Sequence, residues 1–145
     1  MSSLSLQRSK KLLEDQGFKV WIVETWNQWI MQRRDLYNMC DLVAIRHDRA
    51  GILGIQCCGE DVASHVAKLL DGYTDGKGKV WGKNEYLPVW LSAGNLFFIW
   101  AWRKRGGRGE RKTWQLREIE FIVEAGQVVH REMNRGSDEL PGSNE

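Results

Sequence analysis

The chain has 145 residues and a formal net charge of +2, and 42% of its residues are hydrophobic. This length suits one domain with a single sizeable core. No apolar run reaches the roughly 18 residues of a membrane-spanning helix, and the N-terminal segment lacks the apolar stretch of a secretory signal. The three cysteines, Cys40, Cys57 and Cys58, form no disulfide framework, which favours reduced thiols in a cytosolic setting.

The first part of the chain alternates helical and extended patterns. Apolar side chains recur at helical spacing in residues 2–16 and Gly17 follows, so we expect an amphipathic helix that ends at a glycine cap. Residues 18–23 are β-branched and aromatic, which predicts a short strand. Residues 25–39 scatter Trp and Ile among polar side chains, and this pattern indicates a loop or a poorly formed helix.

A β-hairpin is predicted next. Two apolar runs, residues 42–45 and 52–55, flank a polar segment that ends in glycine, residues 46–51. The runs are mostly apolar, so helices should cover the hairpin on one or both faces. Asp41 stands at the start of the first strand and Gln56 near the end of the second. Because the strands are antiparallel, these two side chains should meet at one edge.

The second part of the chain continues the alternation. It should contain a helix over residues 60–70, a Gly-rich exposed loop over 71–82, a short helix over 84–93 with a potential break at Pro88, a strand over 95–102 and a paired strand over 112–123.

These elements predict one α/β domain over residues 1–133, with a mixed central sheet flanked by helices. Residues 123–133 give no clear pattern. Residues 134–145 are polar and acidic, and we expect a disordered tail there. Most of the eight Trp should lie in the core, since indole is a large apolar group.

The predicted edge of the hairpin gathers hard oxygen donors. The Asp41 carboxylate, the Gln56 amide oxygen and the main-chain carbonyl of Cys57 suit Mg²⁺, which takes few protein ligands and keeps several waters. Glu24 and Asp35 could complete the set. Metal-assisted phosphodiester hydrolysis needs a site of this kind. The alternative is that Asp41 is only a turn or cap residue in front of an apolar strand.

The segments DLVAIR and ILGIQCC, with a helix before and after them, resemble the core of the PD-(D/E)xK nuclease superfamily. Within it the chain is most similar to the phage and archaeal Holliday-junction resolvase branch, over residues 4–122. The resemblance implies a restriction-endonuclease-like α-β-β-β-α-β core and a homodimer that binds branched DNA. It also implies Mg²⁺ or Mn²⁺ as cofactor and a cytoplasmic location in a prokaryotic or phage-infected cell.

Two positions depart from the family pattern. Asp41 takes the place of the motif Asp, Gln56 that of the acidic residue and Cys58 that of the Lys. Gln in place of an acid removes a negative charge from the metal site, and Cys in place of Lys removes the cation that steadies water and phosphate. We expect Glu24 or Asp35 to compensate for the lost charge.

The missing Lys has a candidate replacement. Relatives in which the following helix supplies the Lys point to Lys68, with His65 one turn earlier. The glutamate that the family places in its first helix is also absent, because Leu6 lies near that position, and this shifts weight onto Glu24. The alternative interpretations are a solvated Lys68 and a surface His65. Adjacent cysteines point to opposite faces of a strand, which favours packing over a zinc site.

A basic run, RKRGGRGERK at residues 103–112, is the second candidate site. It is either a solvated hairpin tip or a loop that contacts the DNA backbone without reading bases. The predicted DNA-contacting residues are Arg33, Arg34, Arg103, Lys104, Arg105, Arg108, Arg111 and Lys112.

The sequence therefore predicts a Mg²⁺-dependent endodeoxyribonuclease, a hydrolase that resolves Holliday junctions in DNA recombination. Asp41, Gln56, Glu24 and Lys68 are its expected catalytic residues, and a symmetric homodimer would give paired cuts. Trp26, Trp29 and Trp90 are candidates for the dimer surface. The alternative is a nuclease-fold protein that binds nucleic acid or a protein partner without cleaving.

Overall fold

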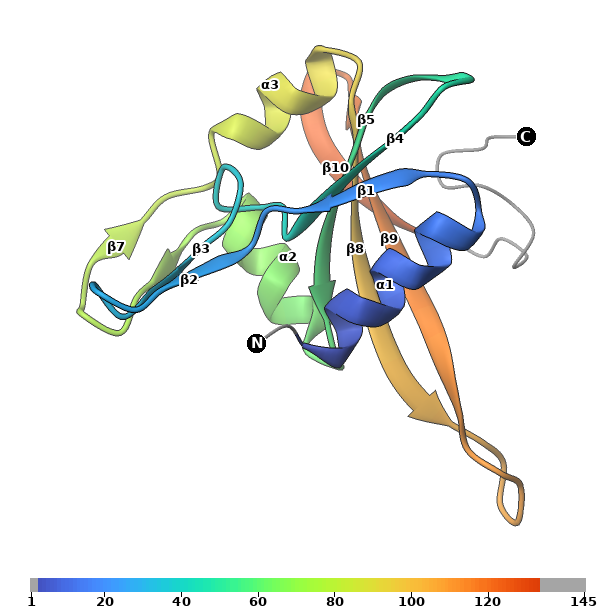
Figure 1. Ribbon diagram of the computed structural model, residues 1–145. Helices are drawn as coiled ribbons and strands as arrows, with labels where there is room; N and C mark the ends of the chain where they lie inside the picture. The colour runs from blue at the N-terminus through green and yellow to red at the C-terminus, as the bar shows by residue number, and fades with distance from the viewer. Residues whose placement is uncertain (1–2, 134–145) are drawn as a thin grey trace.

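The computed structural model describes residues 3–133, so the predicted tail over residues 134–145 lies outside the described residues. At its centre is a mixed six-stranded β-sheet, which together with its flanking helices confirms the predicted α/β class (Figure 1). Neighbouring strands run antiparallel, except for one parallel pair, the third and fourth strands of the sheet. In spatial order the strands are β1 (Lys19–Ile22), β4 (Leu42–Arg46), β5 (Arg49–Cys58), β8 (Leu96–Arg105), β9 (Thr113–Glu124) and β10 (Gln127–Met133).

Helix α1 (Leu4–Asp15) covers one face of the sheet (Figure 1). Ser3 begins it, because its Oγ accepts a 3.1 Å hydrogen bond from the main-chain N–H of Leu6. Leu6 and Leu13 lie on the same side of the helix and are fully buried. The chain leaves the helix at Gly17 with φ of +90°, as a glycine after a helix end allows.

Helices α2 (Val62–Leu70) and α3 (Tyr86–Ser92) pack on the opposite side, so helices cover the hairpin on both faces as predicted. Successive strand residues alternate between the two cores. The α1 side contains Leu42, Ala44, Leu53, Ile55, Phe98 and Trp100, and the α2–α3 side contains Cys40, Cys58, Phe97, Ile99, Ile119 and Phe121.

Among the helices of the described residues, none has both the length and the apolar composition of a membrane-spanning helix.

The β4–β5 hairpin has a tighter turn than the sequence predicted. Leu42 pairs with Ile55, and pairing continues to Arg46 opposite Arg49. The turn is therefore reduced to residues 47–48, and the strands take up most of the segment expected to be loop. An ion pair of 3.1 Å between Arg46 Nε and Asp48 Oδ1 spans this turn.

The chain between β5 and β8 is a long crossover. It carries α2, a small ribbon of β6 (Tyr73–Thr74) and β7 (Val80–Trp81), and α3. The ribbon lies in the segment predicted to be an exposed loop. Asp75 organises it, because one carboxylate oxygen accepts two main-chain N–H groups at 2.9 Å and the other accepts Trp81 Nε1 at 3.0 Å. Pro88 does not break α3, because it lies in the first turn, where a missing N–H costs little.

Residues 25–39 are neither a plain loop nor a helix. They contain a second ribbon, formed by β2 (Thr25–Asn27) and β3 (Gln32–Arg34). Asn27 Oδ1 accepts hydrogen bonds from the main-chain N–H groups of Trp29 and Ile30, at 3.0 and 3.3 Å. This side-chain turn reverses the chain where the apolar pattern gave no signal.

Residues 123–133, which had no clear pattern, largely form β10. A tight turn at residues 125–126 joins it to β9, with φ of +52° and +78° at the two positions. Positive φ at both central residues is typical of a type I′ hairpin turn. Cross-strand ion pairs support the pairing, with Arg131 Nη2 at 2.7 Å from an oxygen of Glu120.

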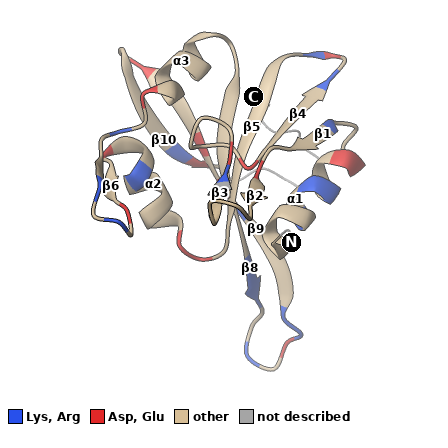
Figure 2. Ribbon diagram, turned by 60° about the vertical axis from the view of Figure 1, so that its left-hand side comes forward, with Lys and Arg blue, Asp and Glu red and all other residues tan. Residues whose placement is uncertain are grey.

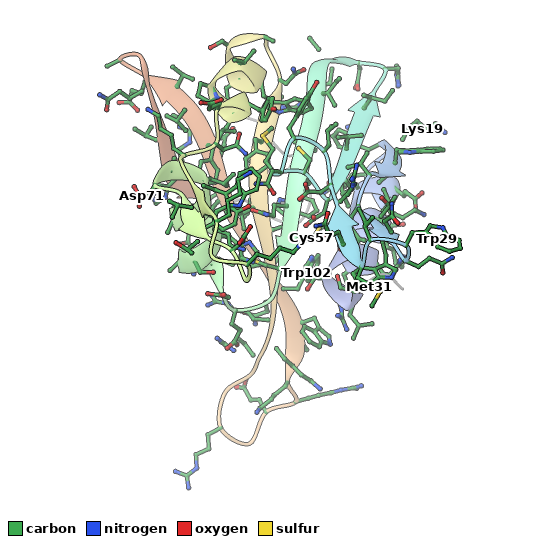
Figure 3. All side chains as sticks on the ribbon, turned by 90° about the vertical axis from the view of Figure 1, so that its left-hand side faces the viewer. Lys19, Trp29, Met31, Cys57, Asp71 and Trp102 are labelled. Carbon is green, nitrogen blue, oxygen red and sulfur yellow. The ribbon has the colours of Figure 1, made fainter. Side chains whose placement is uncertain are left out.

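The expectation that most Trp residues are buried is wrong. Trp100 and Trp90 are buried, with 0% and 8% of their surface exposed, so Trp90 is not available for a dimer surface. The exposed indoles occupy an edge strand, ribbons and a hairpin arm, and no further layer of the fold covers these elements. Trp29, for example, lies on the outside of the molecule (Figure 3). The exposed tryptophans are Trp21, Trp26, Trp29, Trp81 and Trp114.

Candidate functional site

Asp41 and Gln56 lie at the same end of the β4–β5 hairpin. The main-chain N–H of Asp41 donates to the carbonyl of Ile55 at 2.8 Å, which sets Asp41 beside the end of β5. Asp41 Oδ2 accepts a 2.8 Å hydrogen bond from the main-chain N–H of Cys57. The Asp41 side chain is thus held in place by the backbone of the strand that carries Gln56.

Glu24 is held next to Asp41 by the sheet itself. The main-chain carbonyl of Asp41 accepts the N–H groups of both Val23 and Glu24 at 3.0 Å. These bonds place the first residues after β1 beside the start of β4. Two acidic residues that are far apart in sequence therefore meet through main-chain hydrogen bonding, not through their charges.

These side chains line a cavity of about 530 Å³ at the end of the sheet, which we call the acidic cavity. It lies between the start of α1, the ends of β1 and β5, and α2. All of the sequence-predicted metal ligands line it. Its lining residues are Ser3, Ser5, Glu24, Asp35, Asp41, Gln56, Cys57, Cys58, Gly59, Glu60, Asp61 and His65.

Asp35 has a carboxylate with a raised pKa. Burial, the largest cause, and the charge of Glu24 together bring its pKa to about 6, against the opposing effect of backbone N–H groups and Lys68. In this environment the ionised form of the carboxylate is disfavoured, because too little positive charge lies nearby to offset its burial. A bound cation in the acidic cavity would supply that charge and lower the pKa of Asp35.

The thiols in the cavity are not suited to chemistry. Burial is the main reason that the pKa of Cys57 lies well above the usual range of a thiol, and it raises the pKa of Cys58 to about 11. Both side chains are therefore protonated at neutral pH. Cys57 donates to Ser9 Oγ at 3.4 Å on the α1 side, whereas Cys58 packs in the opposite core. Packing is the role that this geometry supports.

Gln56 contributes an amide oxygen without a protein partner. Its Oε1 is buried and has no hydrogen-bond partner within the described chain, and the same holds for Nδ1 of His65. Within residues 3–133, no three His, Cys, Asp or Glu side chains come together closely enough to hold a metal ion by themselves. Mg²⁺ needs only one or two carboxylates besides waters and substrate oxygens. A buried amide oxygen without a protein partner, in a cavity that carboxylates also line, fits such a sparse site.

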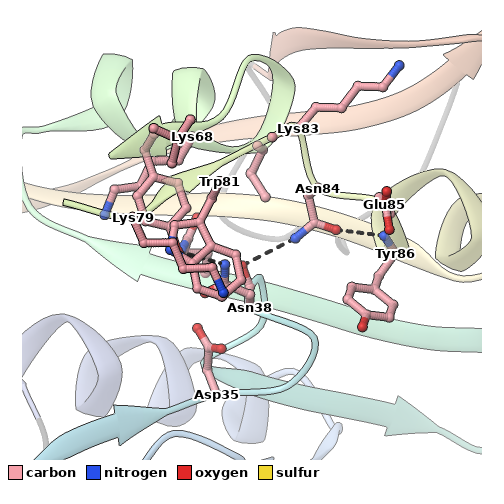
Figure 4. A pocket seen from close by; sticks show the side chains of 14 residues that line it. Asp35, Asn38, Lys68, Lys79, Trp81, Lys83, Asn84, Glu85 and Tyr86 are labelled. Carbon is pink, nitrogen blue, oxygen red and sulfur yellow. Dashed lines mark hydrogen bonds between the residues drawn. The ribbon is translucent and has the colours of Figure 1, made fainter. Parts of the chain in front are cut away.

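Lys68 reaches a second cavity of about 510 Å³, which we call the lysine cavity (Figure 4). It adjoins the acidic cavity, because Asp35 and Gln56 line both. Lys68 Nζ lies 5.0 Å from the ring centroid of Tyr73. Sequence reasoning named Lys68 but missed the other basic and aromatic residues of this cavity, which are Tyr73, Lys79, Trp81, Lys83 and Tyr86. The only local signal was the segment KGKVWGK at residues 77–83, which holds Lys79, Trp81 and Lys83 but does not indicate that they meet Lys68.

The basic run forms an arm that extends beyond the body of the molecule (Figure 2). Strands β8 and β9 form its stem, and residues 106–112 form its tip. Arg105 Nη1 pairs with Glu60 Oε1 at 2.6 Å, and Arg103 is half-buried with its Nε unpartnered within the described chain. The exposed predicted contacts in the arm are Lys104, Arg105, Arg108, Arg111 and Lys112.

Arg33 and Arg34 do not belong to the arm. Both lie in β3, opposite Trp26 and Thr25 of the β2–β3 ribbon. The ribbon and the arm leave the body in different directions (Figure 1). The predicted basic residues therefore belong to two separate elements of the fold, not one.

The chain matches no protein-family model, no curated protein and no solved structure. The chemistry of the two joined cavities therefore carries the functional argument. Oxygen donors in one can hold a divalent cation, and cations in the other can hold a phosphate.

Proposed function

We propose that this protein is a Mg²⁺-dependent endonuclease that acts on branched DNA. The observation that carries the proposal is that Asp35 and Gln56 line both cavities. The carboxylates of Glu24 and Asp41, which suit a metal ion, line one cavity, and Lys68, which suits a phosphate, lines the neighbouring one. Phosphodiester hydrolysis requires both at once.

The topology supports the same proposal. Helix α1, strands β1, β4 and β5, helix α2 and strand β8 follow one another in an α-β-β-β-α-β order. In space the four strands are neighbours, with β8 parallel to β5. This is the order expected of the nuclease superfamily that the sequence resembles, with two ribbons, α3 and a C-terminal hairpin as additions.

Each residue then has a defined task. The carboxylates of Asp41 and Glu24, the Gln56 amide oxygen and the main-chain carbonyl of Cys57 would hold the metal, and Asp35 compensates for the charge absent at Gln56. The bound Mg²⁺ would supply Lewis-acid polarisation of the phosphate and a hydroxide at neutral pH. Lys68 replaces the motif Lys, orienting the attacking water and balancing charge on the phosphate. Arg103, Lys104, Arg105, Arg108 and Arg111 would hold flanking phosphates.

A homodimer is part of the proposal, since two symmetric sites give paired cuts across a junction. Trp26 and Trp29 remain candidates for its surface, because 54% and 87% of their areas are exposed. A specific observation favours a second candidate function, a protein that binds nucleic acid or a protein partner without cutting. Cys58, at the position of the motif Lys, is buried and protonated, so catalysis rests entirely on Lys68 as the substitute.

Cleavage of a labelled four-way junction in Mg²⁺ or Mn²⁺ tests the proposal. The wild type should cut, and Asp41→Asn should not. Asp48→Asn is the matched control, because Asp48 lies in the turn at the far end of the same hairpin. Binding without cutting in either metal would reject the enzyme in favour of the second function. Equal rates for Asp41→Asn and wild type would reject the site but not the activity.

A further inference from the structure

The lysine cavity has a chemistry distinct from that of the acidic cavity. Lys68, Lys79 and Lys83 line it, against the acids Asp35 and Glu85. Its aromatic residues come from the β6–β7 ribbon and from the start of α3. Figure 4 shows Lys68, Lys79 and Trp81 grouped together, with Asp35 facing them from the segment after β3. Cations and aromatic faces together are the composition of a single-stranded nucleic acid site.

The aromatic residues in the cavity are held in place and are only partly covered. Tyr73 and Trp81 are cross-strand partners whose rings lie 10° from parallel with centroids 6.1 Å apart. Trp81 Nε1 is fixed by Asp75, yet 38% of the residue is exposed. Lys79 Nζ lies 3.8 Å from the centroid of the Trp81 ring, so the flexible lysine side chain covers one face of the indole. A base that stacks on this face would displace the ammonium group, which could then contact the phosphate next to that base.

The opposite wall of the cavity is also preorganised. Asn84 Nδ2 donates to the main-chain carbonyls of Tyr37 and Asn38 at 3.1 and 3.3 Å, which ties the start of α3 to the segment before β4. Tyr86 stacks on Tyr37 with ring centroids 4.9 Å apart and remains 53% exposed. The cavity is thus bounded by two aromatic surfaces whose positions do not depend on a ligand.

The size of the cavity selects the form of the ligand. About 510 Å³ lies within the range of small-molecule sites, ~300–1,000 Å³, and suits a single nucleotide. A base pair inside a duplex keeps its bases stacked and could reach Trp81 only if one base left the helix. An unpaired nucleotide has no such cost.

We propose that the lysine cavity binds an unpaired nucleotide next to the scissile phosphate, so that the preferred substrate is DNA with a single-stranded segment at the cleavage point. The position of this nucleotide next to a cleaved phosphate rests on the proposed nuclease function. The binding itself does not require cleavage. Trp81 would stack on the base, while Lys79 and Lys83 hold its phosphates. The adjoining phosphate would lie near Asp35 and Gln56, where the lysine cavity meets the acidic cavity.

Fluorescence anisotropy in EDTA separates binding from cutting. The probes are a fluorescein-labelled oligothymidylate, a blunt duplex, and the same duplex with a single-stranded flap. Wild type should bind the flap and the oligothymidylate more tightly than the blunt duplex. Trp81→Ala should weaken binding of both by about 5-fold to 150-fold, the range for one lost base stack. Trp81→Phe should retain most of the affinity, because it keeps the aromatic face.

Two further variants keep the test decisive. Trp21→Ala removes an indole outside the cavity that is 74% exposed and has no role in the proposed binding surfaces, and it should bind like wild type. Lys79→Ala does not remove the hydrogen bond from Trp81 to Asp75, and it should lower the salt dependence of oligothymidylate binding by about 0.7 in the log–log slope. Melting curves establish that each variant is folded.

The outcomes distinguish this inference from the proposed function. Unchanged affinity in both Trp81→Ala and Lys79→Ala, or a preference for the blunt duplex, would overturn the inference even if the protein cuts junctions. Trp81-dependent binding of the flap would support it even if no metal restores cleavage.

Discussion

Asp41 Oδ2 and the main-chain N–H of Cys57 form a 2.8 Å hydrogen bond that joins the starting end of β4 to the finishing end of β5. The same carboxylate lines the acidic cavity. Asp41 therefore has a structural role and a proposed catalytic role, and substitutions can separate them. The isosteric amide keeps an acceptor for Cys57 but loses the charge that a metal ion needs.

Asp41→Ala should lower the free energy of unfolding by about 1–3 kcal/mol, because it leaves the Cys57 N–H without its acceptor in a largely buried position. Asp41→Asn should lose less, since the amide oxygen can still accept. Urea denaturation of both variants at neutral pH measures the difference. Equal losses would show that the hydrogen bond contributes little to stability.

Asp35 should make the protein less stable as pH rises. Its pKa in the fold, about 6, exceeds the ordinary value of 3.8. The folded state therefore binds the proton more tightly, and the cost of ionising Asp35 grows from about pH 4 and is complete above about pH 6. After allowance for screening by solvent, Asp35→Asn should gain about 1 kcal/mol at pH 7.5.

Urea midpoints of wild type and Asp35→Asn at pH 5 and pH 7.5, without metal, test this. The gain should be smaller at pH 5. A gain that is the same at both pH values would show that the substitution acts through packing and not through ionisation. Added Mg²⁺ should stabilise the wild type more than Asp35→Asn at pH 7.5, if the proposed site forms.

Gly54 should not tolerate a side chain. A Cβ at this position would come within 2.6 Å of Cys40 Sγ and 3.0 Å of a Trp90 ring carbon. Both neighbours are buried, so Gly54→Ala should cost about 1–3 kcal/mol of stability through overpacking. Gly59→Ala is the matched control, because nothing lies within 4 Å of its Cβ position. Thermal melting of the pair compares them, and similar melting temperatures would contradict the packing described here.

The tip of the basic arm should contribute to DNA affinity through charge alone. Arg108→Ala with Arg111→Ala should weaken binding of a duplex and reduce the slope of log affinity against log salt by up to about 2. The control pair is Lys10→Ala with Lys11→Ala, whose ammonium groups are already paired with Glu14 and Asp15 on α1. Filter-binding titrations over a range of salt concentrations measure both pairs of variants. If the two pairs show the same affinity and the same slope, the arm does not contact DNA.

The edge formed by Asp41 and Gln56 could be predicted because it depends on local rules. Alternating apolar residues on both sides of a turn specify an antiparallel pair, and antiparallel pairing brings the two polar ends together. Helix α1 was equally readable, since Gly17 marks its end. These features need no knowledge of contacts between distant segments.

The lysine cavity could not be predicted because distant contacts build it. Asn84 bonds to Asn38, and Asn38 Nδ2 bonds to the hydroxyl of Tyr73 at 3.1 Å, across 46 and 35 positions of sequence. The β2–β3 ribbon was missed for another reason, because a single Asn27 side chain creates its turn. Most Trp residues were expected in the core because indole is apolar, but β1 is an edge strand and 74% of Trp21 is exposed.

The parallel pairing of Gln56 with Ile99 has a consequence for how this fold can vary. A parallel pair requires a crossover, and here residues 59–95 form it without adding a strand to the main sheet. Glu24 and Asp41 lie next to strands of the sheet, after β1 and before β4, whereas Lys68 and the lysine cavity's aromatic residues belong to the crossover. The same crossover supplies Leu69, Leu87 and Trp90 to the α2–α3 core, so only its β6–β7 ribbon is free to change in length or charge without opening that core. Changes confined to the ribbon would alter the proposed nucleotide contacts while the carboxylates keep their positions.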